Sequence, residues 1–221
     1  MDAALDLFRV IWEPGAVFER VREKPRFLAP FIVLAVIALG VAAVQLPFTK
    51  VAIAGQMAQT PNVTPEQTAA ALKVGPIVAV VAPPIFMVLF LLIGAFILWV
   101  MVSVLGGEAK FGTLLSVITY SAVSFIALSI VGLIVLELKG TSAISTPADM
   151  QPALGLDLLA PGATGFVLAF LKGINPFAIW GVYLAGLGTK ITHKTSGGTA
   201  YSAAIVEALL LLLVGAALSR G

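Results

Sequence analysis

Long stretches without charge set the pattern of polar and apolar positions along this chain. The longest lies between Lys73 and Glu108 and holds 34 residues with no ionisable side chain. A helix needs about 20 predominantly apolar residues to cross the hydrocarbon core of a bilayer. Four further stretches lie between Arg26 and Lys50, Lys110 and Glu137, Lys172 and Lys190, and Lys194 and Arg220, and only Glu207 interrupts them. The pattern predicts an integral membrane protein.

The same stretches predict an all-α bundle of five membrane-spanning helices. We expect the spans at about residues 27–44, 76–104, 113–136, 175–191 and 199–218, so that residues 27–221 form one membrane domain. At about 1.5 Å per residue, the second span is longer than the hydrocarbon is thick, and it is expected to tilt. Pro83-Pro84 is expected either to kink this span or to mark its start. Polar loops are expected over residues 48–75 and 137–165.

Short motifs predict where several helices begin and end. Thr64-Pro65-Glu66-Gln67 has the form of a capping box and predicts a short helix that ends near Lys73. Asn175-Pro176 predicts the start of the fourth span, because asparagine caps a helix and proline needs no amide partner there. Gly106-Gly107-Glu108 predicts a tight turn between two spans.

The first 26 residues predict two short amphipathic helices at the level of the lipid headgroups. Leu5, Phe8, Ile11 and Trp12 recur at helical spacing, and Asp2, Asp6 and Arg9 lie on the other side of that helix. Pro14 is well placed at the first position of a second helix, whose apolar stripe is Val17, Phe18 and Val21. The segment is interpreted either as a structural collar packed on the spans or as a surface that docks a partner.

Composition excludes several classes of function. The chain is 60% hydrophobic and 11% charged, whereas about 25% of a soluble protein is charged. A net charge of +2 is too small to indicate nucleic-acid binding. There is no cysteine, which excludes disulfides and thiolate catalysis. His193 is the sole histidine and is expected to be a solvated loop residue, so no metal or cofactor is expected.

The distribution of basic residues predicts the orientation in the membrane. Eight of the 13 Lys and Arg residues lie in the amino-terminal segment, the turn at Gly106 and the turn between the last two spans, counting Lys190 at the end of the fourth span. Basic residues favour the cytoplasmic side, so we expect a cytoplasmic amino terminus and, after five spans, an external carboxyl terminus.

Glu207 is the only acid well inside an expected span. Because an intramembrane carboxylate is energetically costly, Glu207 is a candidate for an ion or proton relay or for pairing with a basic group. Alternatively, it lies at the interface or is protonated. Ser116 and Tyr120 in the third span complete a candidate polar site. Serine and threonine in such helices usually bond back to a helix and no intramembrane base is present, so catalysis is not expected.

Three stretches, in this order, resemble the Yip1 family. They are Trp12-Glu13-Pro14 with Val17-Phe18, the run from Leu105 to Gly112, and Asn175 to Trp180 followed by Leu184 to Gly188. The resemblance implies a five-helix membrane domain. In eukaryotic members it implies roles in vesicle trafficking and binding of Rab-type GTPases or partner membrane proteins. Those members usually carry a long cytosolic amino-terminal region, whereas the first span here begins near residue 27. The chain therefore resembles the prokaryotic branch, which implies a bacterial inner membrane.

The leading hypothesis is a non-enzymatic adaptor or organiser that binds protein partners at its cytoplasmic face. The candidate partner-binding residues are Trp12, Glu13, Pro14, Glu108 and Lys110. Membrane lipid is an expected partner, nucleic acid is not, and self-association through small-residue faces is a further hypothesis. The alternative is a small transporter or channel that uses Glu207.

Overall fold

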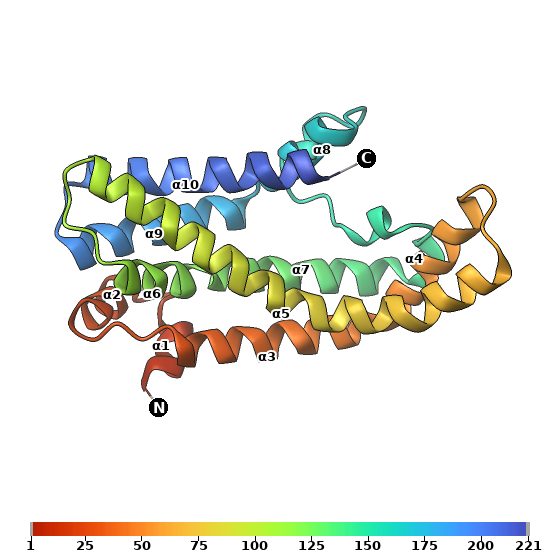
Figure 1. The fold of residues 1–221 in the computed structure, drawn as a ribbon, viewed down its shortest axis with the longest axis horizontal. Helices are drawn as coiled ribbons and strands as arrows, with labels where there is room; N and C mark the ends of the chain where they lie inside the picture. Colours follow the sequence, from red (N-terminus) through yellow and green to blue (C-terminus); the bar gives the residue numbers. More distant parts are fainter. Residues whose placement is uncertain (1, 220–221) are drawn as a thin grey trace. The chain divides into compact units, whose positions relative to one another are not determined.

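A computed structural model describes residues 2–219, and α-helix is the dominant element with no strand in that range (Figure 1). The helices are α1 (Asp2–Arg9), α2 (Pro14–Glu23), α3 (Leu28–Val44), α4 (Leu46–Gln59), α5 (Pro65–Val104), α6 (Phe111–Ser121), α7 (Val123–Lys139), α8 (Gly165–Gly173), α9 (Pro176–His193) and α10 (Gly197–Leu218). Three short 3₁₀ helices, η1 (Thr141–Ala143), η2 (Pro147–Met150) and η3 (Leu156–Leu159), lie between α7 and α8. The structure therefore confirms an all-α fold.

The chain forms two compact units. Unit 1 comprises Met1–Leu34, Val88–Phe125 and Ala153–Gly221, and unit 2 comprises Ala35–Met87 and Ile126–Pro152. The helices α3, α5 and α7 each contribute residues to both units.

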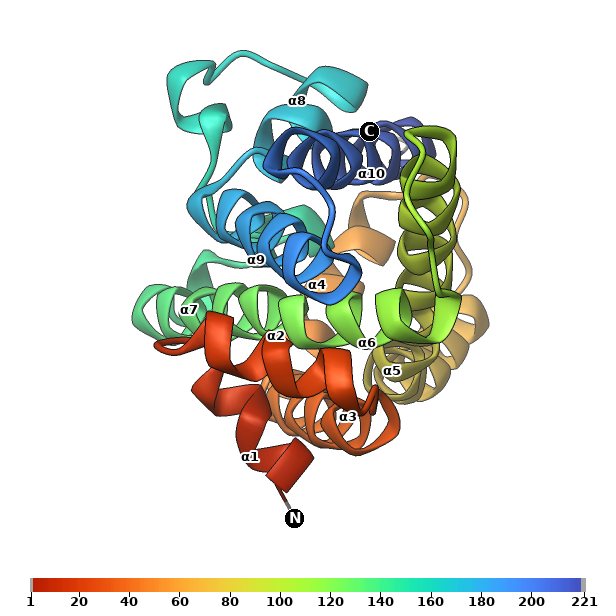
Figure 2. The ribbon, with the colours of Figure 1, turned by 90° about the vertical axis from the view of Figure 1, so that its left-hand side faces the viewer.

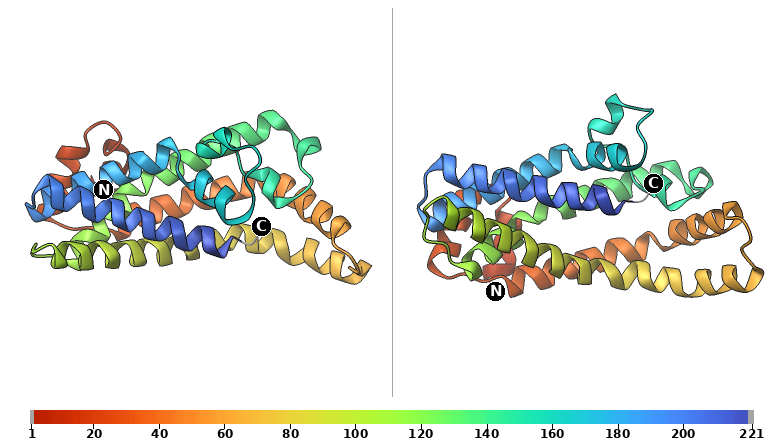
Figure 3. Two further views of the ribbon diagram at one scale, coloured as in Figure 1. Left: turned by 90° about the horizontal axis from the view of Figure 1, so that it is seen from above. Right: turned by 45° about the horizontal axis from the view of Figure 1, so that its top comes forward.

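In unit 1, α9 packs against α2, α6 and α10 (Figures 2 and 3). Glycines make the close approach feasible. A Cβ atom at Gly188 would lie 2.7 Å from Val117 Cγ1 and 2.8 Å from Phe18 Cε1, so only glycine fits there without a shift. Gly186 lies similarly close to the ring of Tyr201 on α10. Glycines of α9 therefore allow the neighbouring helices to approach closely.

Unit 2 has its own small core, in which α4 packs against the segment that follows α7. The buried side chains of this core are Phe48, Ala52, Leu136 and Ile144, with Met150 packed against them. Gly55 on α4 has no side chain, and the backbone carbonyl of Ser145 occupies the space that a Cβ atom would need.

The helices are long and apolar enough for a multi-pass membrane protein. Within the described residues, three stretches qualify on their own: α5, Phe111–Lys139 and α10. The number rises to five if the bent pairs α3–α4 and α8–α9, each with a bend of 58°, count as one span apiece. Large apolar side chains such as Ile77, Phe86 and Phe90 are exposed on α5. A soluble monomer rarely exposes so much contiguous apolar surface, and lipid accounts for it.

The expected polar loop over residues 48–75 is wrong, because most of it is helical. After Val44 the chain continues as α4, and α5 begins as early as Pro65. The short helix expected to end near Lys73 is the first part of α5, which runs 40 residues through Pro76, Pro83 and Pro84. The proline pair therefore neither starts nor interrupts this helix. Proline is tolerated in a membrane helix because neighbouring groups satisfy the freed backbone carbonyls.

The expected third span is present as Phe111–Lys139, with a one-residue break in the helix at Ala122. The break coincides with serine hydroxyl groups that bond to the backbone. Ser121 Oγ donates to the Val117 carbonyl at 2.9 Å, and Ser124 Oγ donates to the Ser121 carbonyl at 3.0 Å. Such side-chain bonds compete with the helical ladder and often bend a helix.

The expected helix caps are confirmed. The Thr64 amide donates to Gln67 Oε1 at 2.9 Å, and the Gln67 amide donates to Thr64 Oγ1 at 3.3 Å. Asn175 Oδ1 accepts from the amides of Phe177 and Ala178 at 3.1 and 3.0 Å, so α9 begins where the Asn-Pro motif predicts.

Candidate functional site

Two helix connections expected to form a docking surface lie at the same end of unit 1 (Figures 1 and 2). Residues 10–13 join α1 to α2 and include Trp12 and Glu13, with Pro14 opening α2. Residues 105–110 join α5 to α6 and include Glu108 and Lys110. The two connections are held in one assembly because α2 packs on both α6 and α9. We call residues 3–26, 105–112 and 192–199 the collar end.

The helix α1 buries a different side from the one its pattern suggested. Ala3, Leu7 and Val10 are buried, whereas Leu5, Phe8, Ile11 and Trp12 are exposed, Trp12 to 63%. Both sides of the helix are apolar, so spacing alone does not determine which side packs. The inward side also carries Asp6, which was expected on the polar side and is 4% exposed. In α2 the expected stripe of Val17, Phe18 and Val21 is buried and is confirmed.

The buried position of Asp6 is compensated by arginine. Arg20 donates from Nε to Asp6 Oδ2 at 3.0 Å and from NH2 to Asp6 Oδ1 at 2.7 Å. Arg9 adds a longer contact from NH1 to Oδ1 at 3.3 Å. The hydrogen bond to Asp6 raises the pKa of Arg20 above its ordinary value. Asp6 and Arg20 are 14 residues apart in sequence, so their bidentate hydrogen bonds connect α1 to α2.

The α5–α6 connection is a tight glycine turn, as expected. Gly106 has a φ of +83°, which favours glycine. The Gly107 amide donates to the Val102 carbonyl at 2.8 Å and closes the end of α5. A Cβ atom at Gly107 would lie 2.7 Å from Val102 Cγ1 and 3.2 Å from Thr195 Cγ2, so the turn packs closely on the α9–α10 connection.

His193 joins the α5–α6 connection to the end of α9, a role that the sequence pattern did not predict. The Lys110 amide donates to His193 Nε2 at 3.1 Å. His193 Nδ1 lies 2.8 Å from Thr192 Oγ1, which itself donates to the Gly188 carbonyl at 2.7 Å. The Nε2 atom accepts and Thr192 Oγ1 already donates, so the proton of the neutral ring belongs on Nδ1. His193 was expected to be a solvated loop residue, but it is partly buried and links the start of α6 to the end of α9. Its position at a helix end was the only sequence feature that indicated this role.

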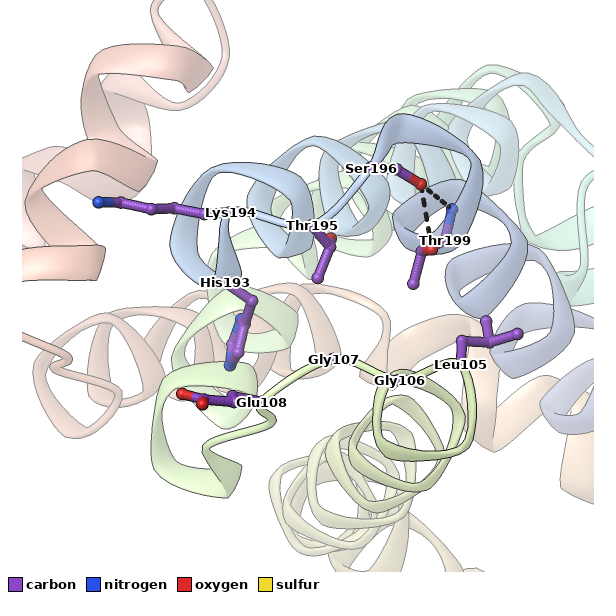
Figure 4. Close-up of a pocket in the computed structure, with 9 residues that line it drawn as sticks. All are labelled: Leu105, Gly106, Gly107, Glu108, His193, Lys194, Thr195, Ser196 and Thr199. Atoms are coloured by element: carbon purple, nitrogen blue, oxygen red, sulfur yellow. Dashed lines mark hydrogen bonds between the residues drawn. The ribbon is translucent and has the colours of Figure 1, made fainter.

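A cavity of about 300 Å³ opens between the α5–α6 connection and the α9–α10 connection (Figure 4). Figure 4 shows His193 next to Glu108, while the Lys194 side chain extends away from them. Ser196 caps α10 by accepting from the Thr199 amide at 3.0 Å. Thr195 Oγ1 is buried without a hydrogen-bond partner among the described residues. The cavity wall is thus a mixed polar surface of backbone and short side chains.

The candidate intramembrane polar site is not assembled as one cluster. Glu207 on α10 is 7% exposed, and its carboxylate lies against Gly94 on α5. Tyr120 instead donates its hydroxyl to the Ala3 carbonyl at 3.1 Å, and Ser116 donates to the Gly112 carbonyl at 3.0 Å. Among the side chains that the structure describes, no hydrogen bond joins Glu207 to either of them and no Lys, Arg or His pairs with it. Glu207 stands as a separate candidate.

Within residues 2–219, no group of three or more His, Cys, Asp or Glu side chains is arranged to hold a metal ion. Three hydroxyl groups of α6, those of Ser116, Thr119 and Ser121, donate to carbonyls of their own helix. The collar end presents apolar, charged and hydrogen-bonding groups.

Comparison with known proteins places these features in a family. The chain matches the family model described as the Yip1 domain over residues 8–218. It is similar to a protein of Bacillus subtilis (strain 168) named membrane protein YknW, with 28% identity over 207 residues that cover 93% of this chain and 84% of that relative. No solved structure matches the chain.

Proposed function

The chain belongs to the Yip1 domain family, and from this premise we propose that it is a non-enzymatic adaptor that docks a protein partner on its collar end. The family match and the apolar helices already make it a multi-pass membrane protein. The proposal adds the mode of action and the place where the partner binds. It also adds the orientation, with the collar end in the cytoplasm and the protein in a bacterial inner membrane.

The observation that carries the proposal is the exposure of Trp12 at the same end of unit 1 as an exposed charged turn. Trp12 is 63% exposed on a connection whose neighbouring helices are firmly packed. Tryptophan on a rigid support is the residue type most often responsible for binding energy at protein interfaces. Leu5, Phe8 and Ile11 extend the apolar surface, and exposed Glu13, Glu108 and Lys110 supply charges at the same end.

The absence of an assembled reactive group among the described residues supports a non-enzymatic role. Nucleophilic catalysis needs a hydroxyl group next to a base. Ser116 and Thr119 donate to helix carbonyls, and His193 is held by Lys110 and Thr192.

Self-association of the chain is a further proposal. Gly181 and Gly188 of α9 pack against the chain's own Ser124 and Phe18, so a second copy would have to use another face.

The test is recovery of partners by a double variant. Trp12→Ala combined with Lys110→Glu should lower recovery of chemically crosslinked membrane partners by roughly thirtyfold, because loss of one tryptophan anchor costs about 2 kcal/mol. Quantitative mass spectrometry of the crosslinked material provides the comparison. The matched control is Trp99→Ala combined with Lys139→Glu, since neither residue belongs to the collar end. Full recovery with the collar variant, at an equal yield of folded protein, would contradict the proposal.

Transport is the alternative, and Glu207 is the observation that favours it. A buried carboxylate without a basic partner in a membrane helix is a candidate proton or cation site. In proteoliposomes, Glu207→Gln should then abolish an ion flux that Glu108→Gln leaves intact. If the wild-type protein supports no flux in gradients of protons, sodium or potassium, this alternative loses its support.

A further inference from the structure

The collar end contains a second cavity, of about 210 Å³, which shares no lining residue with the first. Its lining comes from α1, α2, the residues between α2 and α3, and Tyr120 of α6. Three of the lining side chains are basic: Arg20, Lys24 and Arg26. The acids in the lining are Asp6 and Glu23.

The basic groups are not all neutralised by these acids. Asp6 is engaged by Arg20 and Arg9. Arg22, which lies outside the cavity lining, is paired with Glu19 at 2.7 Å. Lys24 and Arg26 are exposed, and among the described side chains neither forms an ion pair. Within the part of the chain that the structure describes, the cavity therefore keeps two unpaired cations against one unpaired acid, Glu23.

Arg20 is fixed in place and still has donors to offer. A guanidinium group has five N–H donors. Two of them, one on Nε and one on NH2, are used on Asp6, and the Arg20 side chain remains 42% exposed. The two hydrogen bonds to Asp6 fix the plane of the Arg20 guanidinium group, so its remaining N–H groups are oriented before any ligand arrives. A pre-oriented arginine beside two exposed cations is a typical arrangement for binding a phosphate.

The position of the cavity along the chain identifies the class of phosphate compound. Arg26 lies two residues before α3, which begins at Leu28 and is part of a candidate span. Phe27, Leu28 and Ile32 are exposed next to it. A phosphate held by Lys24 and Arg26 would thus be followed directly by an apolar helix surface on which acyl chains can lie. Basic pockets at the ends of membrane helices bind lipid headgroups in this way.

We propose that this cavity binds the phosphate headgroup of an anionic phospholipid, with Arg20, Lys24 and Arg26 as the cationic ligands and the start of α3 as the acyl-chain surface. The site does not depend on the docking of a protein partner. It would fix the depth of α2 at the headgroup level, because a headgroup bound there links the collar to the lipid leaflet.

Native mass spectrometry of the full-length protein in mild detergent tests the proposal with three probes: phosphatidylglycerol, phosphatidylcholine with the same acyl chains, and inorganic phosphate. The wild-type protein should bind one phosphatidylglycerol about tenfold more tightly than phosphatidylcholine. Lys24→Gln combined with Arg26→Gln should remove that preference, since charge-assisted hydrogen bonds to phosphate are lost. Arg22→Gln combined with Lys190→Gln removes the same charge outside the cavity and should keep the preference.

A charge-conserving exchange guards against a folding effect. Lys24→Arg combined with Arg26→Lys should retain both the lipid preference and the thermal unfolding temperature. Equal affinity of the wild-type protein for the two lipids would overturn the proposal, as would equal losses in the cavity variant and its control, or loss of the preference in the charge-conserving exchange. Displacement of phosphatidylglycerol by inorganic phosphate at millimolar concentration would identify a soluble phosphate ligand and would also overturn it.

Discussion

At the scale of single residues, the pairing of Asp6 with Arg20 determines how the collar packs. Asp6 lies on the buried side of α1, where an unpaired carboxylate would be strongly unfavourable. Arg20 supplies two short hydrogen bonds, and Arg9 supplies one longer contact from a more exposed position. The orientation of α1 therefore depends on a residue in the next helix.

This difference between the two arginines is measurable. Arg20→Met should lower the free energy of unfolding by about 1–3 kcal/mol, because it leaves Asp6 buried without its main partner. Arg9→Met should change it by less than about 0.5 kcal/mol, since its contact is long and exposed. Thermal unfolding of the purified protein in detergent provides the comparison. Equal effects of the two substitutions would show that Arg20 does not hold α1.

At the scale of helices, the glycines of α9 explain why α2, α6 and α9 pack so closely. Gly188 lies against Phe18 and Val117, and both of these side chains are fully buried. Gly215 on α10 is a suitable control, because a Cβ atom added there would meet no neighbouring atom within 4 Å.

Adding one methyl group at each glycine should give effects of opposite sign. Gly188→Ala should destabilise the protein by about 1–3 kcal/mol, because the stiff, buried neighbours must move. Gly215→Ala should stabilise it by up to about 1 kcal/mol through helix propensity. Both values come from unfolding in the same detergent. A stabilising Gly188→Ala would mean that α2 does not pack on α9 as described.

The fold could be predicted from the sequence wherever a local rule applies. Asn175 and Thr64 cap helices through neighbouring backbone groups, and the apolar runs must be helical because lipid offers the backbone no hydrogen bonds. The continuity of α5 from Pro65 to Val104 was missed, because Pro83-Pro84 suggested a kink or a helix start. The inward position of Asp6 and the role of His193 were missed for another reason. Each depends on a partner distant in sequence, Arg20 and Lys110 respectively.

At the scale of the whole molecule, the proposed orientation has five spans, which would place the two ends of the chain on opposite sides of the membrane. The chain has no cysteine, so single-cysteine variants report accessibility without background. Ala16→Cys and Lys194→Cys should react with an impermeant maleimide only after the cells are permeabilised. Gln59→Cys and Ser219→Cys should react in intact cells. Labelling of Ala16→Cys and Ser219→Cys from the same side would require an even number of spans.

The central claim, that the collar end docks a protein partner, is tested most directly by photo-crosslinking in native membranes. A photoreactive residue is placed at Trp12 and, in a second protein, at Lys110, with Leu138 as the control position outside the collar end. The account predicts that the same protein is crosslinked from both collar positions and not from Leu138. Adducts with lipid alone, or the same proteins recovered equally from all three positions, would contradict it.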